Sequence, residues 1–155
     1  MKTDMILIAH RGNFEGKNSE LENCPDQITR ALNLGFHVEI DLWRTSNGLF
    51  LGHDEPEYPV NEKYLDNKYF YIHCKNIGAL VWITKQNLSA TYFWHENDDY
   101  TLTSKKEIWT YPGKKLLPGC VAVMPEVSFD GNLEDCSAIC SDYVMKLREK
   151  ISYFS

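Results

Sequence analysis

Short apolar runs alternate with polar segments along much of the chain. Residues 5–9, 36–43, 69–74 and 91–94 are rich in apolar, β-branched or aromatic side chains, and turn residues or polar loops bound these runs. Runs of about four to eight such residues are typical of strands that are buried in a parallel sheet. The pattern therefore predicts four strands of this kind.

Helical patterns separate several of these strands. Residues 25–34 begin with proline and end before Gly35, Asn76 is placed to cap residues 77–86, and residues 144–151 carry apolar side chains on one face. Proline is favoured in the first turn of a helix, asparagine at its amino cap and glycine after its last turn. We expect these three segments to be helices.

The alternation of strand and helix weakens in the second half of the chain. The remaining predicted elements are short: a strand at 49–52, a helical turn at 61–67, a hairpin of strands at 101–103 and 107–110, and buried strands at 120–124 and 137–140.

Strands that alternate with helices predict an α/β fold with a mostly parallel sheet, and the length of 155 residues predicts a single domain over residues 1–155. Polar residues directly follow several strands, which predicts a site at the carboxyl edge of the sheet. A TIM-type (β/α) barrel fits both features, but a full barrel takes about 250 residues. We therefore expect a reduced or incomplete barrel that lacks several helices.

Composition narrows the classes of function. Hydrophobic residues make up 43% of the chain and charged residues 25%, as in ordinary folded proteins, and the net charge is −6. The negative charge argues against a broad nucleic-acid surface, which needs clustered Lys and Arg. No apolar run approaches the roughly 18 residues that predict a membrane span. An anionic substrate would therefore need local cations or a metal ion.

Cysteine usage and the start of the chain bear on location. The five cysteines are an odd number and form no CxxC pair, which favours reduced thiols in the cytoplasm. The first residues lack the long apolar segment and cleavage site of a secretion signal, so we expect no secretion. The oligomeric state stays open.

Two pairs of polar residues are spaced two apart on predicted strands, which turns both members of a pair to one face. Glu39 and Asp41 would form an acidic pocket, and a divalent cation held by oxygen ligands would neutralise it. An edge strand with its acids in water would explain this pair without a metal. His73 and Lys75 repeat the spacing. His73 could be a metal ligand and Lys75 a phosphate-binding cation; the alternative is a core histidine and an exposed lysine.

Two histidines follow apolar strands on either side of the acidic strand. His10 and His53 could act as acid and base, because histidine transfers protons readily near neutral pH. Arg11 adds a fixed positive charge that suits a phosphate oxygen. A single histidine of this kind is more often structural, so the prediction depends on the whole group.

The group forms an ordered signature: Ile8-Ala9-His10-Arg11-Gly12, Glu22-Asn23, Glu39-Ile40-Asp41-Leu42, Thr45, Gly48 and His53-Asp54. In order and spacing it resembles the signature of the glycerophosphodiester phosphodiesterase family, within the phospholipase C-like phosphodiesterases. The resemblance covers residues 6–54, extends to Lys75 and fades afterwards, although Trp109-Thr110 and Ser141-Asp142 are similar to late strands of that family.

The resemblance implies a metal-dependent phosphoric diester hydrolase of lipid metabolism that cleaves a small phosphodiester. A neighbouring hydroxyl of the substrate would attack phosphorus, and water would then open the cyclic intermediate. The implied roles are general acid and base for His10 and His53, phosphate binding for Arg11 and Lys75, and Mg²⁺ or Ca²⁺ binding for Glu39 and Asp41.

The chain departs from the family at His73, where a third metal-binding glutamate usually stands. His73 itself, Glu126 or Glu96 could supply the third ligand, and a histidine would shift the preference toward transition metals. In the family, loops in the middle of the barrel determine which alcohol group of the substrate is bound. The shortened chain lacks them, so the resemblance does not imply specificity for glycerol. Two alternatives stay open: a catalytically weak or inactive relative that binds a phosphorylated ligand or partner, and an enzyme that releases the cyclic product, since sphingomyelinase D-like proteins resemble this group of residues.

Overall fold

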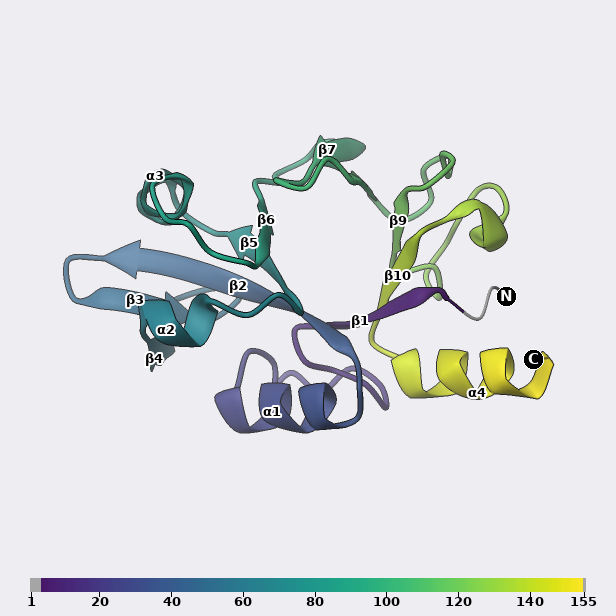
Figure 1. Cartoon of the computed structure of the whole chain (residues 1–155), viewed down its shortest axis with the longest axis horizontal. Coiled ribbons are helices and arrows are strands. Elements are labelled where there is room, and N and C mark those ends of the chain that lie inside the picture. The colour runs from purple at the N-terminus through teal and green to yellow at the C-terminus, as the bar shows by residue number, and fades with distance from the viewer. Residues whose placement is uncertain (1–3, 155) are drawn as a thin grey trace.

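The computed structural model of the protein describes residues 4–154 and has a mixed α/β architecture around one large sheet (Figure 1). The sheet contains ten strands among the described residues: β1 (Ile6–His10), β2 (His37–Thr45), β3 (Gly48–Leu51), β4 (Tyr58–Val60), β5 (Phe70–Cys74), β6 (Thr91–Phe93), β7 (Tyr100–Leu102), β8 (Ile108–Thr110), β9 (Val121–Val123) and β10 (Ala138–Ser141). The helices are α1 (Pro25–Asn33), α2 (Glu62–Leu65), α3 (Ile77–Thr84), α4 (Val144–Phe154) and the 3-10 turn η1 (Leu133–Asp135).

Most of the sheet is parallel. The parallel strands follow the order β6-β5-β2-β1-β10-β9-β8, with β2 between β1 and β5 over its first half. The last residues of β2 turn back into the antiparallel strand β3, and β7 pairs antiparallel with β8 as the predicted hairpin. The predicted α/β fold with a mostly parallel sheet is confirmed.

One strand, β4, was not predicted. It pairs with β3 at an edge of the sheet and carries Pro59 at its centre. Proline lacks a backbone donor and is excluded from central strands, but an edge strand accepts it because one side of the strand needs no partner. Pro59 therefore explains why the sequence pattern did not predict this strand.

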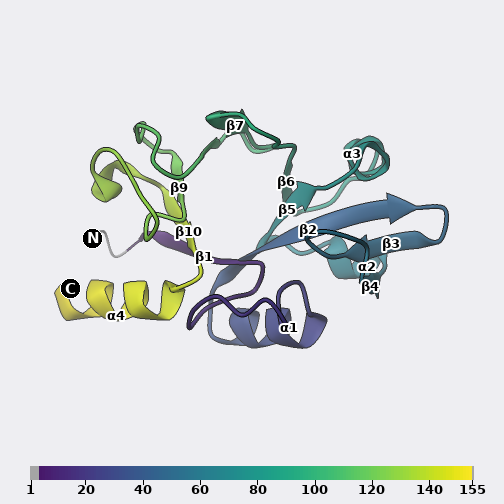
Figure 2. The ribbon, with the colours of Figure 1, turned by 180° about the vertical axis from the view of Figure 1, so that it is seen from behind.

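The sheet is strongly curved (Figures 1 and 2), and β6 and β8, at opposite ends of the parallel order, are in side-chain contact. The rings of Phe93 and Trp109, from these two strands, stack with centroids 4.4 Å apart. Beside them, the Ser104 amide donates to the Tyr92 carbonyl at 2.8 Å. The ends of the sheet thus meet through side chains and loop hydrogen bonds.

Side chains alternate between the two faces of the sheet, and each face buries an apolar cluster. The face covered by helices includes Val38, Ile40 and Leu42 of β2, and α1 and α3 pack against β2 there while α4 packs against β1. The other face, called the inner face below, has a smaller cluster drawn from strands all along the sheet: Ile8, Tyr71, Phe93, Trp109, Val121, Ala138 and Cys140.

The helices cover only part of the sheet. Between β6 and β10 the described chain contains the 3-10 turn η1 and no α-helix, in agreement with the expectation that helices are missing. None of the described helices combines the length and the apolar character needed to cross a membrane. The five cysteines form no disulfide bond.

Candidate active site

A cavity of about 490 Å³ lies at the carboxyl ends of β1, β2 and β5. Parallel strands bring their carboxyl ends to one edge of a sheet, so residues far apart in the sequence meet there. The cavity is lined by seven of the residues that the sequence singled out: His10, Arg11, Glu39, Asp41, His53, His73 and Lys75.

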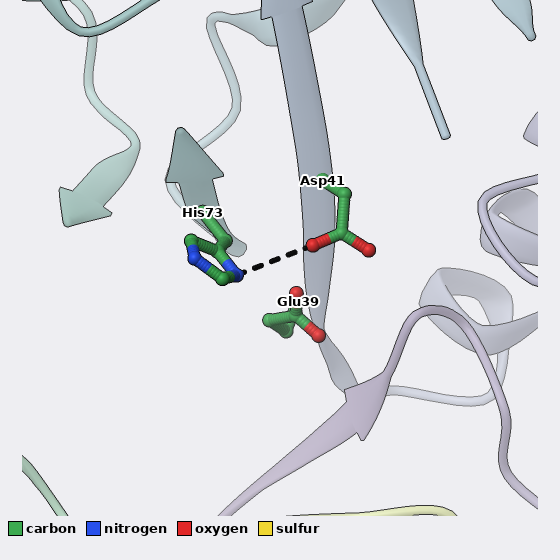
Figure 3. A group of neighbouring side chains, drawn as sticks. All are labelled: Glu39, Asp41 and His73. Carbon is green, nitrogen blue, oxygen red and sulfur yellow. Dashed lines mark ion pairs between the residues drawn. The ribbon is translucent and has the colours of Figure 1, made fainter. Parts of the chain in front are cut away.

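The acidic pair and His73 converge at the base of this cavity (Figure 3). Glu39 and Asp41 are two residues apart on β2 and point to the inner face, and the register places His73 of β5 beside Asp41. One ligand atom from each of the three residues lies within 4.8 Å of the others. The strand pairing alone therefore assembles three potential metal ligands.

Asp41 has one oxygen that is satisfied and one that is not. Its Oδ2 accepts a hydrogen bond from Asn23 Nδ2 at 2.9 Å, and its backbone amide donates to Asn23 Oδ1 at 2.8 Å. Its buried Oδ1 has no hydrogen bond and lies 3.3 Å from His73 Nδ1. A buried carboxylate oxygen without a donor is costly, and a cation at this point would satisfy it.

The hydrogen bond on the far side of the His73 ring decides how the ring faces Asp41. His73 Nε2 lies 3.0 Å from the carbonyl oxygen of His95, which can only accept, so Nε2 carries the proton. His73 Nδ1 faces Asp41 Oδ1 at 3.3 Å, so with a proton it would donate to that oxygen and without one it offers a lone pair to a shared cation. Histidines that bind metals usually donate their second N–H to a carbonyl or carboxylate in this way. The geometry therefore fits His73 as the third ligand.

The two buried acids differ in their electrostatic environment. Burial and the neighbouring Asp41 charge raise the pKa of Glu39, although His10 and Arg11 oppose the rise. Burial also acts to raise the pKa of Asp41, but His53, His73 and Arg11 outweigh it and hold that pKa well below its ordinary value. The charge of Glu39 is thus incompletely compensated by the protein, and a divalent cation would complete the compensation.

Arg11 occupies the turn after β1 in a left-handed conformation, with φ 55°. Its backbone amide donates to Glu39 Oε2 at 3.2 Å, and its guanidinium donates to Glu22 Oε2 at 3.0 Å. A second guanidinium nitrogen lies 3.2 Å from His53 Nε2, which must accept because guanidinium has no acceptor. In neutral His53 the proton is therefore on Nδ1, 3.5 Å from Asp41 Oδ2.

His10 is held by a carboxylate that the sequence did not assign. His10 Nδ1 lies 2.8 Å from Asp142 Oδ1, which also accepts a hydrogen bond from Asn13 Nδ2 at 2.9 Å. The opposite ring nitrogen, Nε2, lies 3.7 Å from Glu39 Oε2. Burial acts to lower the pKa of His10, but the hydrogen bond to Asp142 and the charge of Glu39 raise it above its ordinary value.

The last two cavity residues are placed more openly. The side chain of His53 is 37% exposed, and that of Lys75 forms no hydrogen bond or ion pair within residues 4–154. Lys75 is fixed through its backbone amide, which donates to the Leu42 carbonyl at 2.8 Å. A free ammonium group at the wall of the cavity is available to an anionic ligand.

The other glutamates considered as third ligand lie elsewhere. Glu126 does not join the cluster: it is exposed, accepts hydrogen bonds from Ser141 Oγ and the Asp142 amide, and so supports the loop that carries Asp142. Glu96 is an exposed residue of the cavity wall and is not part of the three-residue cluster.

Four residues of the site had no predicted role: Asn13, Glu22, Asn23 and Asp142. Each follows a signal that is visible in the sequence, since Asn13, Glu22 and Asn23 lie in the polar loop after β1 and Asp142 directly follows the buried strand β10. Which of the other polar residues they contact depends on the folding of the sheet. The sequence alone therefore could not predict their hydrogen bonds to each other and to Asp41.

Comparisons with known proteins leave the chain without an assigned family: no family model, curated protein or solved structure matches it.

Proposed function

We propose that this protein is a metal-dependent phosphodiesterase that hydrolyses a small phosphodiester. The observation that carries the proposal is the convergence of Glu39, Asp41 and His73, each of which offers one ligand atom within 4.8 Å of the others. Two histidines and two cationic side chains line the same cavity. This combination supplies acid–base groups, phosphate-binding charges and a cation site in one place.

Glu39, Asp41 and His73 would hold the divalent cation. Two carboxylates suit Mg²⁺ or Ca²⁺, and the imidazole shifts the preference toward Mn²⁺ or another transition metal. When bound, such a cation polarises phosphate oxygens and orients a hydroxyl group. The charge of the ion would also lower the pKa of Glu39, which burial and Asp41 raise in the metal-free protein.

The remaining groups divide the proton transfers and the binding of phosphate. His10, whose pKa is raised by the hydrogen bond to Asp142 and the charge of Glu39, suits the general acid, and His53, the other histidine placed after a strand at this cavity, suits the general base. Asp142 acts as a positioning residue, because it fixes the His10 ring without facing the metal ligands.

Arg11 and Lys75 would bind the phosphate oxygens. Arg11 offers a planar guanidinium and Lys75 a flexible ammonium, and the two directly follow different strands, β1 and β5, at the cavity. Neither histidine then needs to form a covalent intermediate, since a hydroxyl of the substrate can act as the nucleophile.

We also propose that the sheet is a reduced TIM-type (β/α) barrel. The support comes from the approach of β6 to β8, the stacking of Phe93 on Trp109 and the hydrogen bond from Ser104 to Tyr92. A site at the carboxyl ends of the strands is typical of such barrels. The five cysteines without disulfide bonds are consistent with the proposed cytoplasmic location.

Hydrolysis of the methyl ester of glycerol 3-phosphate, followed by ³¹P NMR with Mg²⁺, Ca²⁺, Mn²⁺ or EDTA, tests the proposed activity. We expect turnover with metal, none in EDTA, and none in a Glu39→Ala/Asp41→Ala variant. The same spectra distinguish the cyclic phosphate from the opened monoester. No turnover with any metal would reject the proposal and favour a protein that only binds phosphorylated ligands.

A further inference from the structure

A second hollow adjoins the proposed active site and is not used by the chemistry described above. It is a groove of about 910 Å³ that shares His10, Arg11 and Met124 with the catalytic cavity. The groove extends from there over the loop after β9 and along α4. A molecule bound at His10 and Arg11 therefore has two spaces beside it.

The groove has an exposed apolar wall. Val127, Phe129, Leu133 and Leu147 line it, and the first two are 71% and 48% exposed. Exposed side chains of this size gain free energy when a ligand covers them. The chemistry of these walls fits a hydrocarbon group.

Lysines contribute to the same groove. Lys17, Lys146 and Lys150 line it, and none of them forms an ion pair with a carboxylate of the described chain. Lys146 Nζ lies 5.1 Å from the ring centre of Tyr143. The methylene stems of lysines can extend an apolar surface while their ammonium groups stay in water. The groove thus suits a chain attached to an anionic group.

A phosphodiester has two alcohol groups, and the two hollows can receive one each. The proposed metal ligands Glu39, Asp41 and His73 line only the catalytic cavity, so the alcohol whose hydroxyl attacks phosphorus belongs there. The other alcohol departs on the opposite side of phosphorus. His10 borders both hollows, so it can reach the departing oxygen.

We propose that the groove beside His10 binds an apolar chain on the departing alcohol, so that the substrate is a single-chain amphiphilic phosphodiester. The inference rests on the proposed phosphodiesterase function and adds the class of substrate. In the reaction, the attacking hydroxyl oxygen bonds to phosphorus and the bond from phosphorus to the departing oxygen breaks. One histidine takes the hydroxyl proton and the other protonates the departing oxygen, which gives the cyclic phosphate and the free alcohol; water then opens the cyclic phosphate to the monoester.

The test uses methyl, butyl and octyl esters of glycerol 3-phosphate below their micelle concentrations. Burying one methylene contributes about 0.8 kcal/mol. This corresponds to about a fourfold gain in kcat/KM for each methylene that the groove covers completely. We expect kcat/KM for the octyl ester to exceed that for the methyl ester by at least about tenfold. In Phe129→Asp and Val127→Asp this preference should fall while turnover of the methyl ester is kept.

Ile77→Asp is the matched control, because Ile77 is 62% exposed and lies on α3, outside the groove. It should keep the preference for the octyl ester. Equal kcat/KM for all three esters, or an unchanged preference in Phe129→Asp, would overturn the groove proposal and leave the phosphodiesterase function standing.

Calorimetric binding of the same esters to the metal-free protein separates failure of the groove from failure of the function. Tighter binding of the octyl ester that is lost in Phe129→Asp, without turnover of any ester, would support the groove and reject the activity. Equal binding of the methyl and octyl esters would overturn the groove directly.

Discussion

Replacing Asp142 by Asn removes one charge from the partner of His10 and changes little else. The amide oxygen of Asn can still accept from Asn13 Nδ2 and from His10 Nδ1–H, which now lie 2.9 and 2.8 Å from Asp142 Oδ1. The fold should therefore persist, with a melting temperature close to that of the original protein. The variant isolates the electrostatic support that Asp142 gives to the protonated imidazole.

The size of the effect follows from the type of hydrogen bond. A hydrogen bond to a charged group contributes about 1.5–3 kcal/mol, and about 1.36 kcal/mol corresponds to a factor of ten in rate. Asn keeps a neutral hydrogen bond of about 0.5–1.5 kcal/mol, so the variant loses about 1–1.5 kcal/mol, and we expect kcat for a glycerophosphodiester to fall by about 5- to 15-fold in Asp142→Asn. For the methyl ester of glycerol 3-phosphate, which has no chain to place in the groove that Asp142 borders, the fall should appear in kcat more than in KM, because Asp142 does not line the catalytic cavity.

The pH profile gives a second readout. Asp142 contributes to the raised pKa of His10, and a general acid loses activity as pH rises through its pKa. In Asp142→Asn that pKa falls, so the alkaline limb of the profile should move to lower pH. Asp99→Asn is the matched control, because Asp99 is exposed and pairs with Lys114 at 3.4 Å, away from His10. An unchanged kcat with an unmoved alkaline limb would refute the role of Asp142.

Three further predictions concern the acidic strand. Because the pKa of Glu39 is raised above 4.5 in the fold, the unfolded chain releases this proton at lower pH than the folded protein does, and the free energy of unfolding falls as pH rises from 4.5 through the folded pKa. In urea unfolding with EDTA present, Glu39→Gln should not show this fall. Parallel pH profiles for the two proteins would contradict the prediction. Replacing His73 by Glu should shift metal preference from Mn²⁺ toward Mg²⁺, as read by thermal shift, whereas an unaltered preference would remove His73 from the ligand set. Asn23→Ala removes two hydrogen bonds to Asp41 and should lower the free energy of unfolding by about 2–4 kcal/mol. A decrease in this free energy of less than about 1 kcal/mol, roughly the value of one neutral hydrogen bond, would show that Asp41 is held by other groups.

The sequence predicted the parts of the site that depend on strand periodicity. Glu39 and Asp41 share a face because side chains alternate along β2, and His73 joins them because β5 pairs with β2 in parallel. A spacing of two residues is a local property, so it can be read without knowing the fold. The parallel sheet was predictable from another local pattern, the alternation of strands with helices.

Contacts between distant segments could not be read in this way. His10 and Asp142 are 132 residues apart, and only the parallel pairing of β1 with β10 brings their strand ends together. Glu126 was a candidate ligand because it follows a buried strand, but its partners Ser141 and Asp142 hold it away from the acidic pair. Sequence position placed these residues near the correct edge of the sheet and left their partners undetermined.

The central claim is that Glu39, Asp41 and His73 hold a divalent cation, and anomalous diffraction from a crystal soaked in Mn²⁺ tests it most directly. The account predicts one anomalous peak within about 2.0–2.6 Å of an atom from each of the three side chains, the range of divalent cations with such ligands. A crystal without a peak between them, with the carboxylates of Glu39 and Asp41 turned apart, would contradict the claim.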